Sequence, residues 1–405
     1  MTSTALLRPD TEIAQRMIAQ DGPISVQTSL GTISLRMTRD LQGLKGLWEA
    51  MQAAAPCTAA QTYDWAQAWT KTVLGPAGRE PAVAVGYGAD GAALFLWPFE
   101  IGTAFGLRVM KWLGQDHANY NMGLFLPVAA EGLSAKDISR LLREVASQAG
   151  AAAAILDAQP VTWDGVANPL AKLSHQQSPN SGYAIRLSDF TALYESRFSK
   201  RSRTTLERKE RRLHEFGTLH YGWAETRDEK LALLETFFAQ KSRQFAAMGI
   251  KNVFDVHARA FYREIALLDG DNPSRLRLGY LKLDDKVLAT FSGAVCHKRM
   301  GVVLSSLAEG DTQRQSPGAL LMRHQIAEAA DAGLAYFDLG VGKARHKDEW
   351  CDVVQALFDS FIAFKPQGLL LTLPLSAMAR LKRVIKSNSR LWSAAQEMRT
   401  RLLGR

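Results

Sequence analysis

A loop late in the chain carries the residue types that hold a diphosphate. Residues 309–315 are mostly polar, follow an expected strand and lead into a helix that opens at Ser316. The start of a helix offers backbone N–H groups without partners and a partial positive charge, and both favour an anion. Arg314 can add a direct charge, and Gly318 lets a phosphate approach the backbone. We predict an anion site here; the alternative is an ordinary capped helix after a polar turn.

A second cluster of titratable side chains lies at the end of the next expected strand. Residues 338–350 combine two glycines with several charged groups, and functional sites gather at strand ends in α/β sheets. Lys347 can hold a phosphate or polarise a carbonyl. A general base can come from His346, Asp348 or Glu349. The alternative is a solvated loop, which is what most such charge clusters are.

Two further polar segments are candidates for binding a substrate. Between residues 197 and 212 stand eight basic residues against two acidic ones, and their apolar neighbours form only a narrow helical stripe. This helix either faces water or lines an anionic groove, and it lacks the aromatic residues that stack on nucleic-acid bases. In the first half of the chain, residues 114–121 either line a cleft or form a surface turn. The residues assigned to substrate from these segments are Lys200, Arg203, Arg211, Tyr120 and Asn121.

The elements that must position these residues occur twice in the same order. Each half is expected to hold helices, a hairpin, a further strand, a helix and a final strand. Gly86 and Tyr87 in the first hairpin match Gly279 and Tyr280 in the second. Either the fold is duplicated or these short matches are chance, and we favour duplication. Because the polar stretch 174–182 has linker composition, we predict domains at residues 30–180 and 181–372.

The last segment, residues 373–405, is predicted to be a basic amphipathic helix. From Pro374 onward there are eight basic residues against one acidic residue, and apolar residues such as Met378, Leu381 and Trp392 recur at helical spacing. Such a helix can dock on the protein or lie on an anionic membrane face. We favour docking and keep peripheral membrane contact as the alternative.

Composition limits the class of protein. The chain has 405 residues, of which 47% are hydrophobic and 22% charged, so it is not mainly disordered or collagen-like. No apolar stretch reaches the roughly 20 residues of a spanning helix, and no secretory signal is expected. The three cysteines lie far apart, which favours a reducing cytoplasm, with the inner face of the membrane as the site of any tail contact. The histidines show no metal-ligand spacing, so we expect no metal.

Short motifs spread over residues 30–365 carry a resemblance to a known family. In the second half they are residues 199–203, Arg211, Arg212, Ser316, Pro317, Gly318, Phe337, Asp338, Gly342, Lys347 and Trp350. In the first half they are Tyr63, Asp64, Trp65, Trp69, Trp97, Pro98, Leu113, Gly114 and Tyr120. With these residues the chain resembles bacterial acetyltransferases of cellulose and exopolysaccharide biosynthesis, which have a GNAT domain and are relatives of the FemAB peptidoglycan ligases.

The resemblance implies a mixed α+β fold with two tandem GNAT-like domains, each a mostly antiparallel sheet with flanking helices. It implies acetyl-CoA or another acyl-CoA as cosubstrate on the second domain. The acceptor would be an amino sugar, or a nucleotide- or lipid-linked sugar precursor of an extracellular polysaccharide. In the family's pyrophosphate loop a Gln or Arg is followed by a glycine and then by a small residue. Gln315 and Gly318 fit this pattern, but the small residue comes early, at Ala319, and Leu320 stands in its usual place.

The mechanism we expect is direct transfer within a ternary complex. An amine attacks the thioester carbonyl, and a backbone N–H near Ser305, which we count with the cofactor-binding residues, stabilises the oxyanion. Asp338 or Glu349 is the candidate base, and Lys347 the electrostatic helper. His346 is counted with the substrate-binding residues, and the basic helix would hold the acceptor's phosphates.

Two other functions stay open at this point. A FemAB-type ligase would use the same fold with an aminoacyl-tRNA as donor, and tRNA is the one nucleic acid we would then expect as a partner. A degenerate acyltransferase without activity could instead bind a polysaccharide-synthesis complex at the membrane through its tail.

Overall fold

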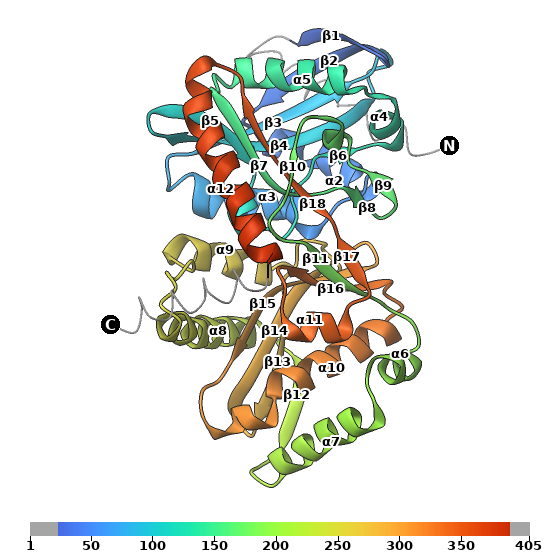
Figure 1. Ribbon diagram of the computed structural model, residues 1–405, viewed down its shortest axis with the longest axis vertical. Coiled ribbons are helices and arrows are strands. Elements are labelled where there is room, and N and C mark those ends of the chain that lie inside the picture. The colour runs from blue at the N-terminus through green and yellow to red at the C-terminus, as the bar shows by residue number, and fades with distance from the viewer. Residues whose placement is uncertain (1–22, 389–405) are drawn as a thin grey trace. The chain divides into compact units, whose positions relative to one another are not determined.

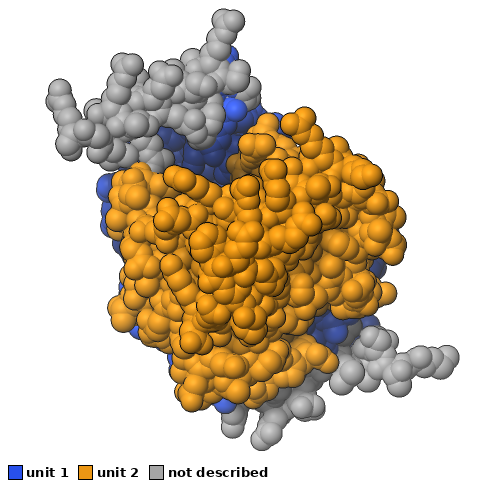
Figure 2. Space-filling view, turned by 90° about the horizontal axis from the view of Figure 1, so that it is seen from below, with its two compact units in different colours: residues 1–181, 355–405 blue, residues 182–354 orange. Residues whose placement is uncertain are grey.

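The computed structural model describes residues 23–388 and divides the chain into two compact units, drawn as a ribbon in Figure 1 and in two colours in Figure 2. Unit 1 comprises residues 1–181 and 355–405, and unit 2 comprises residues 182–354. The chain therefore leaves unit 1, builds unit 2 and returns to complete unit 1.

Unit 1 is built on a mixed sheet with the strand order β1-β2-β3-β4-β5-β7-β18-β10, and β6 pairs with β4. Strands that are neighbours in this order pair antiparallel, except β5 and β7, which are parallel. The strands are β1 (Ile24–Thr28), β2 (Gly31–Thr38), β3 (Glu80–Tyr87), β4 (Ala93–Ala104), β5 (Leu107–Trp112), β6 (Leu124–Phe125), β7 (Ala153–Pro160), β10 (Gln176–Gln177) and β18 (Leu357–Ala363), with a separate hairpin of β8 (Thr162–Trp163) and β9 (Val166–Ala167).

Helices cover both faces of this sheet because its side chains alternate in direction along each strand. Met110 of β5 faces one side and packs in the core with Leu141 of α5, whereas Val109 faces the other and packs with Leu371 of α12. The helix α5 begins with a capping box between Ser134 and Asp137. The helices of unit 1 are α2 (Lys45–Ala54), α3 (Tyr63–Trp69), α4 (Pro127–Gly132), α5 (Ala135–Gln148) and α12 (Leu369–Ser387).

Unit 2 repeats this plan on a sheet with the order β12-β13-β14-β15-β16-β11-β17. Here β15 and β16 are the parallel pair. Phe291 of β14 lies in the core beneath α10, whereas its neighbour Thr290 faces α8, where Gln240 hydrogen-bonds Ser306. The strands are β11 (Gly182–Arg186), β12 (Leu219–Trp223), β13 (Arg277–Leu283), β14 (Lys286–Cys296), β15 (Arg299–Leu307), β16 (Tyr336–Val341) and β17 (Val353–Gln355). The helices are α6 (Phe190–Arg197), α7 (Lys200–His214), α8 (Arg227–Ala247), α9 (Val256–Ala266), α10 (Pro317–Asp331) and α11 (Arg345–Trp350).

The predicted mixed α+β class and the repeated order of elements are confirmed. In both units a hairpin, β3-β4 or β13-β14, is followed by an antiparallel strand, a crossing helix and a strand parallel to the preceding one. A strand followed by a helix and a parallel strand is the βαβ crossover that brings the two strands side by side.

The division of the chain differs from the expected one at its second boundary. The expected second domain ran to residue 372, but β18 pairs antiparallel with β7 of unit 1, with Phe361 opposite Ile155. Phe358 is 1% exposed in the core of unit 1, so burial of this side chain fixes residues 357–363 there. The helix α12 begins at Leu369 rather than at residue 373, and residues 389–405 of the expected tail lie outside the described residues. No helix within residues 23–388 is long and apolar enough to cross a membrane.

We expect Phe358→Ala to weaken unit 1 selectively. Removing a buried phenylalanine side chain costs about 3–5 kcal/mol, because contacts are lost and a cavity remains. Hydrogen exchange should show lost protection in β7 and β18 but not in β16. The control is Val354→Ala at a residue that is 64% exposed, which should change little. Equal loss of protection in both sheets would contradict the assignment of β18 to unit 1.

Candidate active site

The sheet of unit 2 divides between its two parallel strands. β15 and β16 pair only at Arg299–Tyr336, Met300–Phe337 and Gly301–Asp338. Beyond these residues β15 stays paired with β14 as far as Leu307, while β16 stays paired with β11 as far as Val341. Two strands that separate while their outer neighbours stay attached leave backbone groups on their inner edges without a ladder partner.

The helix α10 crosses from the end of β15 to β16, and its start is the predicted anion site. Gln315, Ser316, Gly318 and Ala319 are half-buried, and Arg314 is exposed. Ser316 adopts a left-handed conformation with φ 56°, and its Oγ receives a hydrogen bond of 2.7 Å from Lys209.

Not every amide at this helix start is available to a ligand. The N–H groups of Ala319 and Leu320 both donate to the Ser316 carbonyl, at 3.0 and 3.2 Å, and Pro317 has no N–H. The Gly318 N–H has no hydrogen-bond partner among the described residues. A side chain at Gly318 would press on Leu307, since an added Cβ would lie 2.9 Å from its Cδ2. The glycine therefore also serves the packing of α10 on β15.

At the end of β15, Ser305 meets a lysine that the sequence did not single out. Nζ of Lys241 in α8 donates to the Ser305 carbonyl at 3.2 Å, and burial lowers the pKa of this lysine. A cation thus reaches the backbone at the position where an oxyanion contact was predicted. Lys241 lies among other polar residues of α8 and belongs to no motif, so only the packing of α8 on the sheet reveals it.

The structure places Asp338 and Lys347 together at the end of β16. Asp338 is 1% exposed, with Oδ2 3.0 Å from Nη1 of Arg299 and Oδ1 accepting the Gly340 N–H at 2.8 Å. Lys347 Nζ donates to the carbonyls of Gly340 and Val341 at 3.0 and 3.1 Å. Burial lowers the pKa of Lys347, and the Asp338 carboxylate opposes that shift. Both groups hold the turn after β16 in shape.

The other residues assigned near this turn remain at the surface. Glu349 is exposed and forms a 3.0 Å ion pair with Arg345, one turn earlier in α11. His346 is exposed beside it. The structure therefore does not bring Glu349 to the buried pair of Asp338 and Lys347.

The basic helix α7 adjoins the start of α10 through Lys209. Its Arg203 is paired with Glu195, and its Glu210 receives hydrogen bonds from Tyr221 and Arg323. The remaining cations point to solvent without such partners in the described part of the chain. These exposed cations are Lys200, Arg201, Arg208, Arg211 and Arg212.

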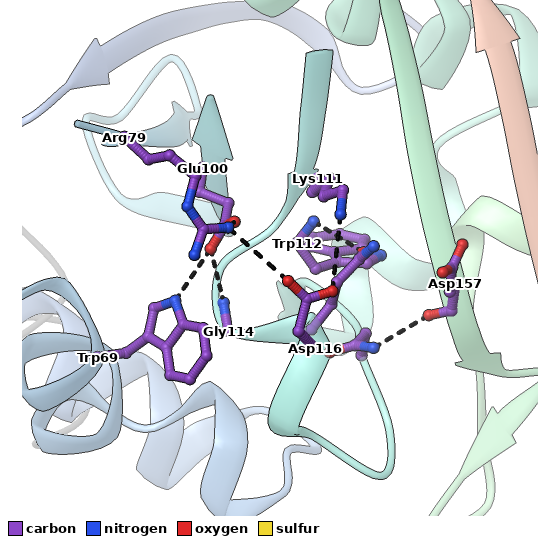
Figure 3. Close-up of polar contacts among 10 residues, drawn as sticks. Trp69, Arg79, Glu100, Lys111, Trp112, Gly114, Asp116 and Asp157 are labelled. Atoms are coloured by element: carbon purple, nitrogen blue, oxygen red, sulfur yellow. Dashed lines mark hydrogen bonds and ion pairs between the residues drawn. The ribbon is translucent and has the colours of Figure 1, made fainter. Parts of the chain in front are cut away.

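In unit 1 the loop after β5 corresponds to the loop after β15 in unit 2. A buried glutamate anchors this loop of unit 1 (Figure 3). Glu100 of β4 is 1% exposed and accepts hydrogen bonds from Arg79 at 2.6 Å, the Trp69 indole at 3.0 Å and the Gly114 N–H at 3.1 Å. Burial raises the pKa of Glu100, and the Arg79 charge opposes that shift. Asp116 then bridges Arg79 and Lys111, at 3.8 and 3.6 Å. This chain of alternating charges fixes the start of residues 114–121.

The end of the same loop fills the separation between β5 and β7, which pair only at Val109–Ala153 and Met110–Ala154. Asn121 is 1% exposed, and its backbone N–H and Nδ2 donate to the carbonyls of Ala158 and Asp157, each at 3.1 Å. Tyr120 is buried against Trp163, with ring centroids 4.9 Å apart. Tyr120 and Asn121 are both buried, so the expectation that they line a cleft is wrong for both residues.

Two carboxyl groups that the sequence did not assign meet at a β-bulge beside this loop. The pairing of β7 with β18 shifts at Asp359, whose carboxylate accepts the Ala158 N–H at 2.9 Å. Ala158 itself has φ 51°, which is strained for a residue other than glycine. Oδ1 of the neighbouring Asp157 is buried without a hydrogen-bond partner among residues 23–388. Burial, and then the Asp359 charge, raises the pKa of Asp157 to about 6, so this group can exchange a proton near neutral pH.

With this geometry in view, comparison with known proteins identifies part of the chain. Residues 200–348 match the profile of the acetyltransferase (GNAT) domain. This span runs from α7 into α11 and contains the separated strands and the start of α10. Unit 2 therefore carries a GNAT-like acetyltransferase domain. No curated protein matches the sequence.

Solved structures show the same fold over most of the chain. FemX is 12% identical, with a TM-score of 0.59 over 83% of this chain and 100% of its own. A conserved protein of unknown function from Bacteroides thetaiotaomicron is 13% identical, with a TM-score of 0.52 over 80% of this chain and 99% of its own. At these identities the likeness shows the fold alone.

Asp157→Asn should stabilise the protein at neutral pH. Since the folded-state pKa of Asp157 is raised, the folded chain holds this proton more tightly than the unfolded chain does. Ionisation therefore costs stability as the pH rises from about 4 to about 6, and the cost persists above that range. We expect the variant to gain about 1–3 kcal/mol near pH 7 in urea unfolding, and the gain to vanish near pH 4. The control is the exposed Asp331→Asn, and a loss of stability by Asp157→Asn near pH 7 would contradict the assignment.

Proposed function

We propose that unit 2 transfers an acyl group from an acyl-CoA to the amino group of a sugar. The observation that carries this proposal is the separation of β15 from β16 at the start of α10, within residues that match a GNAT acetyltransferase domain. Acetyl-CoA is the donor we favour. The acceptor is an amino sugar, or a nucleotide- or lipid-linked sugar precursor of an extracellular polysaccharide.

The donor's diphosphate would lie at the start of α10. The free Gly318 N–H and the positive end of a 15-residue helix favour an anion there, and Arg314 is exposed beside them. The Lys209 ammonium is already held at Ser316 and adds positive charge to the same place. Because Ala319 and Leu320 direct their amides to Ser316, Gly318 carries most of the backbone contact in this proposal.

Transfer then forms one C–N bond and breaks one C–S bond. The amine attacks the thioester carbonyl, the tetrahedral intermediate expels CoA as a thiolate, and the proton that the amine loses to a base or to water passes to that thiolate. The Ser305 backbone and Lys241 stand at the end of β15 where negative charge would develop on the carbonyl oxygen. Asp338 and Lys347 order the turn after β16, and the exposed Glu349 remains our candidate for proton removal.

The acceptor's phosphates would be held by α7. Five cations of this helix are exposed, and phosphate is recognised by arginine and lysine through charge and hydrogen bonding. Arg203 differs from them because it is neutralised by Glu195. We therefore assign phosphate contact to Lys200 and Arg211 before Arg203.

One observation favours a second function. The likeness to FemX covers the whole of that chain and 83% of this one, so it extends beyond the GNAT domain of unit 2 into unit 1. An aminoacyl-tRNA-dependent ligase would place tRNA rather than CoA against the cations of α7.

The helix α12 supports contact with an anionic membrane. It has no acidic residue, and its basic residues are Arg380, Lys382, Arg383 and Lys386. Large apolar side chains are exposed along it, namely Leu369, Leu370, Leu373, Met378, Leu381 and Val384. Each basic residue near an anionic surface contributes about 1 kcal/mol, and exposed apolar groups add burial in the interface.

Acetyl-CoA should bind the full chain in calorimetry, and thiol release should depend on an amino-sugar acceptor. Ala319→Asp should weaken acetyl-CoA binding by about tenfold or more, because the new carboxylate repels the diphosphate. An acidic residue in the first turn stabilises a helix, so the loss would not come from unfolding. Val256→Asp places the same charge in the first turn of α9 and should bind normally.

Two results would count against acyl-CoA transfer. One is equal binding of acetyl-CoA by both Asp variants. The other is amino-acid transfer that disappears on ribonuclease treatment in the absence of any CoA binding, which would favour the ligase.

The full chain should sediment with phosphatidylglycerol vesicles and not with phosphatidylcholine vesicles, and salt should weaken the binding. Replacing Leu373 and Leu381 together by glutamine should abolish it, whereas replacing the exposed Val256 and Val354 should not. Binding to both vesicle types alike, or to neither, would exclude this membrane contact.

A further inference from the structure

Unit 2 contains a cavity of about 180 Å³ between α10 and the sheet. It lies by the last turns of α10, at the opposite end of this helix from Ser316, so it is separate from the proposed donor site. Its apolar wall consists of Met300, Ala329, Leu334 and Phe337. An apolar cavity of this size can stay free of water, but three polar side chains also line it.

The first polar side chain is a buried glutamine with an unmet acceptor. Gln325 is 2% exposed, and its Nε2 donates to the Phe291 carbonyl at 2.9 Å. That hydrogen bond fixes the orientation of the amide, so its other atom is the oxygen. Oε1 of Gln325 is buried without a hydrogen-bond partner among the described residues. A buried acceptor left in this state costs free energy unless a ligand or water supplies a donor.

The lack of a side chain at Gly279 of β13 leaves the space that Gln325 occupies. An added Cβ on Gly279 of β13 would lie 1.7 Å from Nε2 of Gln325 and 2.8 Å from the Phe291 carbonyl oxygen. Any larger residue at position 279 would therefore push Gln325 out of the cavity. The glycine and the glutamine form one packing unit at the floor of the site.

Two opposite charges border the same cavity. Glu328 lies three residues after Gln325, so both acceptors are on one face of α10. The Trp223 indole donates to Glu328 at 2.9 Å, and the Arg277 guanidinium carbon lies 4.3 Å from the centre of the Trp223 ring. Arg277 makes no ion pair with any residue of the described chain. Trp223 therefore stands between the Glu328 carboxylate and the Arg277 guanidinium, and a ligand can reach the guanidinium.

We propose that this cavity binds a small apolar α-amino acid. Its ammonium group would lie between Oε1 of Gln325 and the Glu328 carboxylate, and its carboxylate would meet Arg277. Its apolar side chain would lie on Met300 and Phe337. Each polar atom of the site then has a partner of the right kind.

Other small ligands meet fewer of these groups. Glu328 already accepts from Trp223 and lies 3.4 Å from Nε2 of His324, but a plain hydrocarbon chain leaves Oε1 of Gln325 without a donor and Arg277 without an anion. A dicarboxylate places a second negative charge near Glu328, and a diamine places a second positive charge near Arg277. The zwitterion is matched to both charges at once, and the proposal does not depend on acyl transfer elsewhere in unit 2.

The test is calorimetric titration of the full chain with L-leucine and L-phenylalanine at millimolar concentration. Two analogues dissect the recognition: leucinamide lacks the carboxylate, and isocaproate lacks the ammonium group. We expect both to bind about tenfold more weakly than leucine, or worse. Hydrogen exchange should show that leucine protects the last turns of α10.

Matched variants locate the binding. Arg277→Met and Glu328→Gln each remove one charge with little change in size and should weaken leucine binding by about tenfold. Lys282→Met removes a cation of the same strand outside the cavity and should leave the affinity unchanged. Circular dichroism checks that each variant is folded.

Three outcomes would overturn the proposal. The first is that neither amino acid binds the wild-type chain, which would leave the cavity to water. The second is that the two analogues bind as well as leucine, which would make the site merely apolar. The third is that folded Arg277→Met keeps full affinity, which would place the ligand elsewhere.

Discussion

Both units depend on a parallel pair of strands that stays together for only two or three residues. Parallel strands joined through a helix begin side by side, and here their outer antiparallel neighbours then hold them apart. The free inner edges need partners, because unpaired buried backbone groups are costly. In unit 1 the chain supplies them itself, through Asn121 bound to the carbonyls of β7. In unit 2 Lys241 donates to the Ser305 carbonyl near the end of β15, and the start of α10 packs on Leu307 of the same strand. This difference is why we put the donor there.

The sheet of unit 1 is completed by a strand from the far side of unit 2 in sequence. β18 covers the outer edge of β7, and Phe358 enters a core whose other fully buried residues all lie at or before Leu170. Contacts between residues so far apart in sequence carry a loop-closure entropy cost, which grows slowly with the length of the loop. The strand also carries Asp359 to the bulge beside Asp157, so the feature that completes the sheet also creates the acidic pair.

The buried carboxyl groups of this protein are of two kinds. Asp338 has a guanidinium and a backbone N–H within 3.0 Å, as a buried carboxylate requires. Asp157 has no such partner for Oδ1 and faces a second carboxyl group, so its ionisation destabilises the fold. Gln325 is the neutral counterpart, with one satisfied end and one free acceptor. Buried polar atoms without a hydrogen-bond partner lower the stability of the fold, and such destabilised positions are often found at ligand sites.

The sequence by itself determined the elements and their repetition, because hydrophobic periodicity, capping residues such as Ser134 and the βαβ order are local signals. It also located the start of α10 and the turn after β16. Only the tertiary structure decided that residues 357–363 join unit 1, since antiparallel pairing with β7 is a contact between distant segments. The same is true of Lys241 at Ser305, the Asp157–Asp359 pair and the cavity around Gln325. Each is made by side chains from separate elements, and local spacing carries no information about which strand or helix lies opposite.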